Sequence, residues 1–204
     1  DTISNYLETN TPFVCYVKPN ETVWNLLIQK NDELVEFTNQ SGFVFVPFHE
    51  GKQVVIPFEG NSFSHGNLEN LVKKPTENFT SDSNQKEAFE DLVTKGVSAI
   101  QQSEFDKVVL SRKIVLKKQI AIIETFQNLI PSYPTAFRYL FFHPKVGLWM
   151  GATPEQLVKI NQSQFETVAL AGTQLYSENV IWEAKEIEEQ QFVTDYIVTK
   201  VKDK

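Results

Sequence analysis

The sequence predicts an α+β protein in which antiparallel β-sheets pack face to face and helices lie on the outside. Short apolar runs separated by polar turns fill residues 11–58, which is typical of β-hairpins. A helical pattern follows at about 84–102, and paired apolar runs come after it. This order of one helix and several strands favours antiparallel sheets with external helices. With 204 residues and 41% apolar side chains, the chain is long enough to bury a core.

The first part of the chain reads as strands and turns. Five runs, TPFVCYV, VWNLLIQ, LVEFT, GFVFVPF and VVIPF, are broken by the turns KPNE, KND, NQSG and HEGK. His49 and His65 stand in turn-like contexts without a second metal ligand, so we expect both at the surface. Residues 61–83 are polar and predict a long connection. We therefore expect one internal boundary, between a β-rich part with its linker at 1–83 and a second part at 84–204.

The helix predicted from about 84 to 102 begins after Asp82, which forms a capping-box pattern with Gln85. Its apolar positions follow helical spacing: Phe89, Leu92, Val93, Val97 and Ile100. The next run, FDKVVLSRKIVL, predicts a strand that opens at Lys107. This lysine is either an exposed edge residue or an enclosed one, and desolvation would make an enclosed amine available as a base.

A short helix is predicted at about 121–130, ending before Pro131. TAFRYLFF and GLWM then form a predicted hairpin through the turn HPKV, with His143 solvated in that turn. A second hairpin joins LVKI to FETVALA around NQSQ. Two of these predicted strands, 148–150 and 168–170, lead into turns of small residues, GATPE and AGT, where backbone can approach a ligand.

The last segment, from about residue 180, is predicted to be helical. Its apolar stripe consists of Phe192, Val193, Tyr196 and Ile197. Glu189 falls near the centre of this stripe, where a carboxylate needs a partner. The partner is either Lys185, four residues away on the same helix, or a metal ion.

Composition excludes several classes of partner. The formal charge of -7, without a basic run, argues against nucleic acid or an anionic membrane. No apolar run reaches the length of a membrane span, and the N-terminus lacks a signal pattern, so we expect a cytoplasmic protein. The single cysteine, Cys15, is predicted to be a buried apolar residue, and a zinc site built on cysteines is excluded.

Four blocks, KVVLSR at 107–112, GATPE at 151–155, LAGT at 170–173 and KEIEEQ at 185–190, together resemble the chorismate-utilising enzymes. That family includes isochorismate, salicylate, anthranilate and aminodeoxychorismate synthases. The resemblance covers the chain from Asn84 onward and implies that 84–204 is the first part of a chorismate-binding catalytic domain. The bound partner it implies is a small molecule, chorismate.

The resemblance also assigns catalytic roles. A lysine at the start of KVVLSR is similar to the isochorismate and salicylate synthases, which add water, whereas the ammonia-using synthases typically have glutamine. Lys107 would be the general base that deprotonates the water, and Glu155 the general acid that protonates the departing ring hydroxyl. The implied activity is that of an isochorismate synthase.

Binding roles follow from the other two blocks. Ala171, Gly172 and Thr173 would contact the substrate, and Glu189 would be one ligand of a Mg²⁺ ion that holds the ring carboxylate. In the family a histidine usually follows this glutamate, and here Gln190 takes its place.

The family continues well beyond the point that corresponds to Lys204. We therefore expect a fragment that lacks the C-terminal half of the catalytic domain, with its further metal ligand and cations, and that is inactive alone. Exposed strand edges would then promote self-association. Three alternatives stay open: a salicylate synthase, a non-catalytic module that keeps the fold, and an unrelated β-rich interaction domain. The pathway, whether to menaquinone, a siderophore or salicylate, is not specified by these residues.

Overall fold

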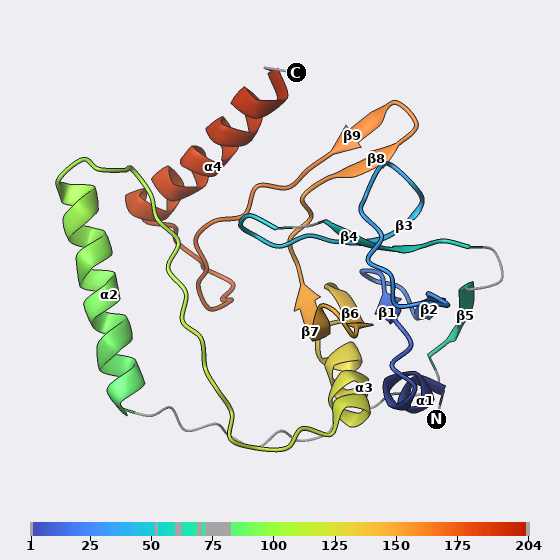
Figure 1. Ribbon diagram of the computed structural model, residues 1–204. Coiled ribbons are helices and arrows are strands. Elements are labelled where there is room, and N and C mark those ends of the chain that lie inside the picture. The colour runs from blue at the N-terminus through green and yellow to red at the C-terminus, as the bar shows by residue number, and fades with distance from the viewer. Residues whose placement is uncertain (1, 52, 60–62, 69–70, 72–82, 203–204) are drawn as a thin grey trace. The chain divides into compact units, whose positions relative to one another are not determined.

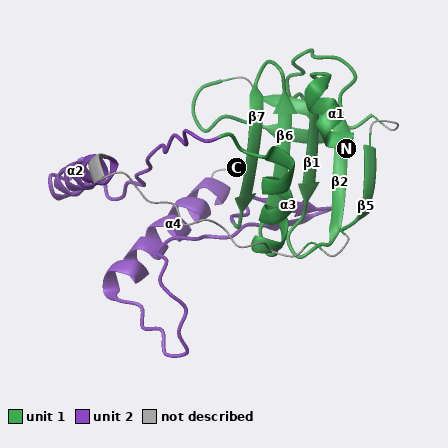
Figure 2. Cartoon of the chain, turned by 90° about the horizontal axis from the view of Figure 1, so that it is seen from below, with its two compact units in different colours: residues 1–75, 119–154 green, residues 76–118, 155–204 purple. Residues whose placement is uncertain are grey.

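The computed structural model describes residues 2–51, 53–59, 63–68, 71 and 83–202. The chain folds into two compact units, residues 1–75 with 119–154 (unit 1) and residues 76–118 with 155–204 (unit 2) (Figure 2). Helices and antiparallel strands are both present, so the predicted α+β class is confirmed. The observed units differ from the single expected boundary after residue 83, because residues 119–154 belong with the N-terminal strands.

Unit 1 is built on a five-stranded antiparallel sheet with the order β5-β2-β1-β6-β7 (Figure 1). A separate hairpin, β3–β4, and two helices complete it. The elements of this unit are α1 (Thr2–Glu8), β1 (Phe13–Val17), β2 (Val23–Ile28), β3 (Gly42–Phe45), β4 (Val54–Pro57), β5 (Phe63–Asn67), α3 (Ile122–Ser132), β6 (Phe137–His143) and β7 (Gly147–Thr153). The predicted hairpin through HPKV is therefore confirmed as β6–β7.

Both faces of the sheet are buried at its central strand β1, whose alternate side chains point to opposite sides. Phe13, Cys15 and Val17 pack with α1 and α3, which lie on the same face of the sheet (Figure 2). Val14 packs on the other face with the β3–β4 hairpin, where the Phe45 and Phe141 rings stack at 4.5 Å. The expected packing of one sheet against another is therefore found within unit 1.

Arg138 in β6 is a buried cation that connects this strand to α3 and to the β1–β2 connection. It is 2% exposed, and its guanidinium donates hydrogen bonds to the carbonyl oxygens of Ile130, Lys18 and Glu21. These carbonyls belong to the last turn of α3 and to the β1–β2 connection. A buried charge is tolerated where such acceptors replace its hydration, so Arg138 fixes α3 against the sheet.

Several local predictions in unit 1 are wrong. The run LVEFT, residues 34–38, is not a strand and contributes only one isolated bridge among the described residues, at Glu36. The polar connection predicted from residue 61 contains β5, an edge strand whose backbone pairs with β2, and the capping residue Asp82 lies outside the described residues. Helix α3 continues past Pro131 to Ser132, since a proline in the last turn removes a single backbone donor. His143 is fully buried rather than solvated, because it ends β6 with its side chain directed inward.

Unit 2 consists of α2 (Ser83–Gln101), the short hairpin of β8 (Lys159–Asn161) and β9 (Gln164–Glu166), and α4 (Ala184–Lys202). These confirm two predicted helices and the hairpin around NQSQ. The runs expected as strands at 107–116 and 168–170 are not strands, because neither has a hydrogen-bonded partner strand among the described residues. The first of them packs on α2, where Gly96 lies close to Val108 and Leu110.

Candidate functional site

Lys107 and Glu189 form an ion pair in unit 2, although they lie far apart in the chain. The Lys107 Nζ lies 3.1 Å from the Glu189 Oε1, and the two side chains are 25% and 33% exposed. The structure thus brings together the predicted base and the predicted metal ligand. The ion-pair partner of Glu189 is not Lys185 but Lys107, a lysine from a distant segment that sequence periodicity could not identify.

Helix α4 directs Glu186, Glu189 and Gln190 to one side. These residues are half-buried, whereas the neighbouring Lys185 and Glu188 are exposed. Spacings of three and four residues place side chains on the same helical face, which explains the grouping. The sequence blocks assigned no role to Glu186, and the structure places it beside Glu189 on the same helical face. Its i, i+3 relation to Glu189 is the signal that could have found it.

A pocket of about 570 Å³ lies between α4 and the extended segment that carries LAGT, both in unit 2. Its lining combines small residues with polar and aromatic ones: Ala169, Leu170, Ala171, Gly172, Trp182, Glu186, Ile187, Gln190 and Gln191. The backbone approaches the helix closely at Gly172, where an added Cβ atom would lie 3.2 Å from the Glu186 Cγ. A side chain at position 172 would therefore press on Glu186.

The predicted substrate contacts Ala171 and Gly172 line this pocket, and Thr173 follows them at an exposed position. Glu155 stands just after β7 and Pro154, is exposed, and does not line this pocket. Lys107 does not line it either. Their roles as acid and base stay predictions from the resemblance.

The Gln190 side chain links α4 directly to the LAGT segment. Its Nε2 donates a hydrogen bond of 3.0 Å to the carbonyl oxygen of Ala169. The sequence identified Gln190 as a departure from the family pattern and assigned it no contact. The bond could not be predicted, because it depends on the packing of two segments that lie 21 residues apart.

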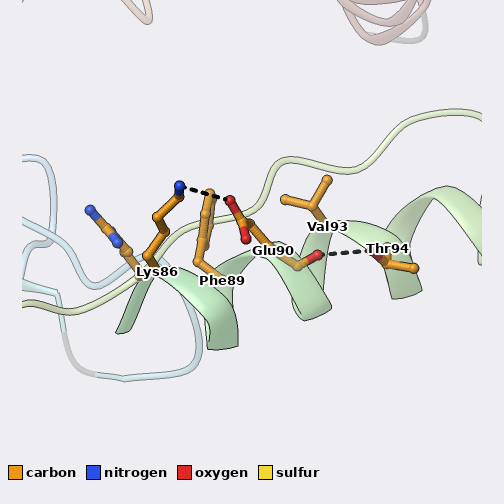
Figure 3. A pocket seen from close by; sticks show the side chains of 6 residues that line it. Lys86, Phe89, Glu90, Val93 and Thr94 are labelled. Atoms are coloured by element: carbon orange, nitrogen blue, oxygen red, sulfur yellow. Dashed lines mark hydrogen bonds and ion pairs between the residues drawn. The ribbon is translucent and has the colours of Figure 1, made fainter. Parts of the chain in front are cut away.

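A second hollow, on α2, is a surface groove without any of the predicted site residues (Figure 3). Lys86 pairs with Glu90 at 3.5 Å, and the Arg112 guanidinium lies 5.6 Å from the centre of the Phe89 ring. Figure 3 shows Lys86 and Glu90 joined along the exposed side of the helix. These contacts are typical of a solvated helix surface.

Carboxylate oxygens are the ligands that Mg²⁺ prefers, and α4 offers Glu186 and Glu189 one turn apart. The type of donor therefore fits the ion. The number does not, because the described residues contain no group of three His, Cys, Asp or Glu side chains placed to hold a metal. The negative charge of Glu189 is moreover balanced by the positive charge of Lys107 in the ion pair.

A comparison with known protein families identifies the family to which this chain belongs. A model of the family described as chorismate binding enzyme matches residues 52–204, three quarters of the chain. The chain belongs to the chorismate binding enzymes. The resemblance inferred from the four sequence blocks is thereby confirmed.

Individual relatives agree with this family. The isochorismate synthase EntC of Escherichia coli strain K12 is 25% identical over 138 residues, which cover 63% of this chain and 35% of the relative. The isochorismate synthase EntC of Escherichia coli O157:H7 matches over the same length with the same identity. The chain thus spans about a third of the length of these curated relatives. No solved structure matches, and none of the described helices could cross a membrane.

Proposed function

We propose that this member of the chorismate binding enzymes contributes to an isochorismate synthase. The observation that carries the proposal is the ion pair of Lys107 with Glu189, because it places an amine from KVVLSR beside the carboxylate of KEIEEQ. Both matched relatives are named isochorismate synthases, which supports the same assignment at 25% identity. Since the chain spans 35% of their length, the proposal concerns the whole protein.

In the proposed reaction, water adds to the ring of chorismate while the original ring hydroxyl leaves. Lys107 is charged in the ion pair with Glu189, so it must first lose a proton; as the free amine it then takes one proton from the attacking water, whose oxygen forms the new bond to carbon. Glu155, as the acid, gives its proton to the departing hydroxyl, which leaves as a second water molecule. The double bonds of the ring shift between the two positions, so that isochorismate is an isomer of the substrate.

Glu189 has two proposed tasks. Its ion pair orients the Lys107 amine in the structure, and its carboxylate is the proposed ligand of Mg²⁺ in the working enzyme. The ion would hold the ring carboxylate of the substrate. Because the described residues do not complete a metal site, no catalytic step proposed here depends on the ion.

The test is conversion of chorismate by the full-length protein that the gene encodes, with Mg²⁺, in water enriched in oxygen-18. We expect isochorismate that carries one heavy oxygen in the new hydroxyl, because that oxygen comes from solvent. Recovery of salicylate and pyruvate would instead identify a salicylate synthase. No turnover by a folded full-length protein would favour the non-catalytic module. The 204-residue chain in the same assay tests the expectation that it is inactive alone.

A lysine variant tests the assignment of the base. Lys107→Gln removes the titrating amine and should lower kcat by roughly 10²–10⁴-fold, the usual contribution of a general base. The control is Lys113→Gln, an exposed lysine of the same extended run, which should leave kcat within about twofold. Equal activity of the Lys107 variant and the wild type would exclude this lysine as the base.

A further inference from the structure

The LAGT segment, taken as residues 168–173, has little backbone pairing of its own. Within the described part of the chain, residues 168–173 form neither a strand nor a backbone hydrogen bond to another segment. Without backbone hydrogen bonds, the φ and ψ torsions of an extended segment are less restrained. Within the described residues, the contacts that hold Ala171 and Gly172 in place come from side chains of the helix beside them.

Three side chains at intervals of four residues, Trp182 just before α4 and Glu186 and Gln190 on it, provide this support. Trp182 and Glu186 stand next to Gly172, and Gln190 donates to the Ala169 carbonyl. The first two contacts limit how closely the segment can approach the helix. The third one is directional, because a hydrogen bond fixes the plane of the peptide that carries the acceptor.

We infer that Gln190 is a positioning residue for substrate binding: its amide holds the Ala169 carbonyl, and thereby the orientation of the Ala171–Gly172 backbone that meets the ligand. The inference rests on the proposed function, since the ligand is chorismate. Gln190 suits this task because its amide group can donate to a carbonyl without carrying charge. A glutamate of the same shape would set a charged acceptor against the carbonyl oxygen and lose the bond.

The first measurement is backbone order in the 204-residue chain by nitrogen-15 relaxation. In Gln190→Glu and Gln190→Leu we expect the order parameters of Ala171 and Gly172 to fall from the rigid range, about 0.85, towards about 0.6. The matched control is Glu188→Leu, because Glu188 is an exposed residue of the same helix and does not line the pocket. Unchanged order parameters in both Gln190 variants would overturn the inference, whatever the protein catalyses.

The second measurement is steady-state kinetics with chorismate in the full-length enzyme. The Gln190 variants should raise KM roughly fivefold, the factor for one lost neutral hydrogen bond, with kcat changed less than about twofold. Gln190→His should restore KM, because a ring N–H can donate to the same carbonyl. If the order parameters of Ala171 and Gly172 fall but KM does not change, Gln190 has only a structural role and the inference is wrong.

The two measurements separate this inference from the proposed function. If the order parameters fall but the full-length wild-type enzyme does not act on chorismate, the isochorismate synthase proposal fails and the inference that depends on chorismate fails with it. If chorismate is converted while the Gln190 variants keep wild-type KM, the proposal stands and the inference fails alone.

Discussion

The two units of this chain differ most in what they bury. Among the described residues, the buried apolar side chains of the core, from Phe13 to Phe141 in the sequence, all belong to unit 1. Among the described residues of unit 2, only Gly96 is buried. Large side chains of unit 2, such as Leu157 and Leu175, are 88% and 93% exposed. The predicted chemistry nevertheless lies in unit 2, with Lys107, Glu155 and the LAGT segment.

In this protein, the residues that stabilise the fold and the residues of the candidate site therefore lie in different units. Unit 1 is stabilised by apolar burial on both faces of a sheet, which is the dominant favourable term in folding. Unit 2 is held by isolated contacts, such as the Lys107–Glu189 pair and the Gln190–Ala169 bond. Single contacts of this kind each contribute about 1 kcal/mol or less to stability. Substitutions in the two units should therefore have very different costs.

The largest contrast is expected between two phenylalanines. Phe141 is fully buried in β6, and Phe141→Ala should lower the free energy of unfolding by about 3–5 kcal/mol, since it leaves a cavity. Phe165 in β9 is 53% exposed, and Phe165→Ala should cost less than about 1 kcal/mol. Urea unfolding of both variants measures the difference. Similar midpoints would show that unit 1 does not dominate the stability of the chain.

A smaller effect is expected from His143, through pH. Its Nδ1 accepts a hydrogen bond from the Lys145 backbone N–H at 3.1 Å, so the neutral ring carries its proton on Nε2, 3.4 Å from the Glu33 carbonyl. Burial lowers the pKa of His143, and Lys145 lowers it further, against the opposing effects of Glu33 and Asp32. A proton on Nδ1 would break the bond from Lys145.

The sign of the pH effect follows from this lowered pKa. Below the ordinary histidine pKa of about 6.5, the unfolded chain binds a proton that the folded chain excludes, so stability falls as pH decreases from about 7. His143→Gln should flatten the pH dependence in this range, as measured by unfolding at several pH values. His65→Gln is the control, because His65 is exposed. A wild-type protein whose stability is constant from pH 7 to pH 5 would contradict the argument.

The smallest effect is expected for the ion pair of unit 2. A double-mutant cycle with Lys107→Met and Glu189→Gln should give a coupling energy below about 1 kcal/mol, because both side chains remain partly exposed. The more exposed Lys159–Glu166 pair, at 3.9 Å, should give a coupling close to zero. Increasing salt should weaken both. A coupling of several kcal/mol would mean that unit 2 is more tightly organised than its exposure indicates.

Local patterns predicted the elements that local chemistry determines. The helical spacing from Phe89 to Ile100 located α2, and the turns HPKV and NQSQ located the two hairpins. The polar run around His65 concealed β5, since an edge strand needs only backbone pairing. The turn residues after His143 indicated a solvated position, yet the alternation of β6 directs that ring inward.

The sequence predicted a set of candidate site residues and not their arrangement. Sequence blocks identified Lys107, Glu155, LAGT and Glu189, and the family to which they point is confirmed. The pairing of Lys107 with Glu189 and the contact of Gln190 with Ala169 join segments far apart in the chain. Periodicity describes one element at a time, so it cannot specify such contacts.

Cys15 has a practical consequence. It is the single cysteine of the sequence, it lies in β1 and is 6% exposed, and burial raises its pKa to about 12. At neutral pH it is therefore protonated and shielded from thiol reagents. A fluorophore or spin label coupled to a cysteine introduced on either unit would report from that position alone, with the native thiol left in place.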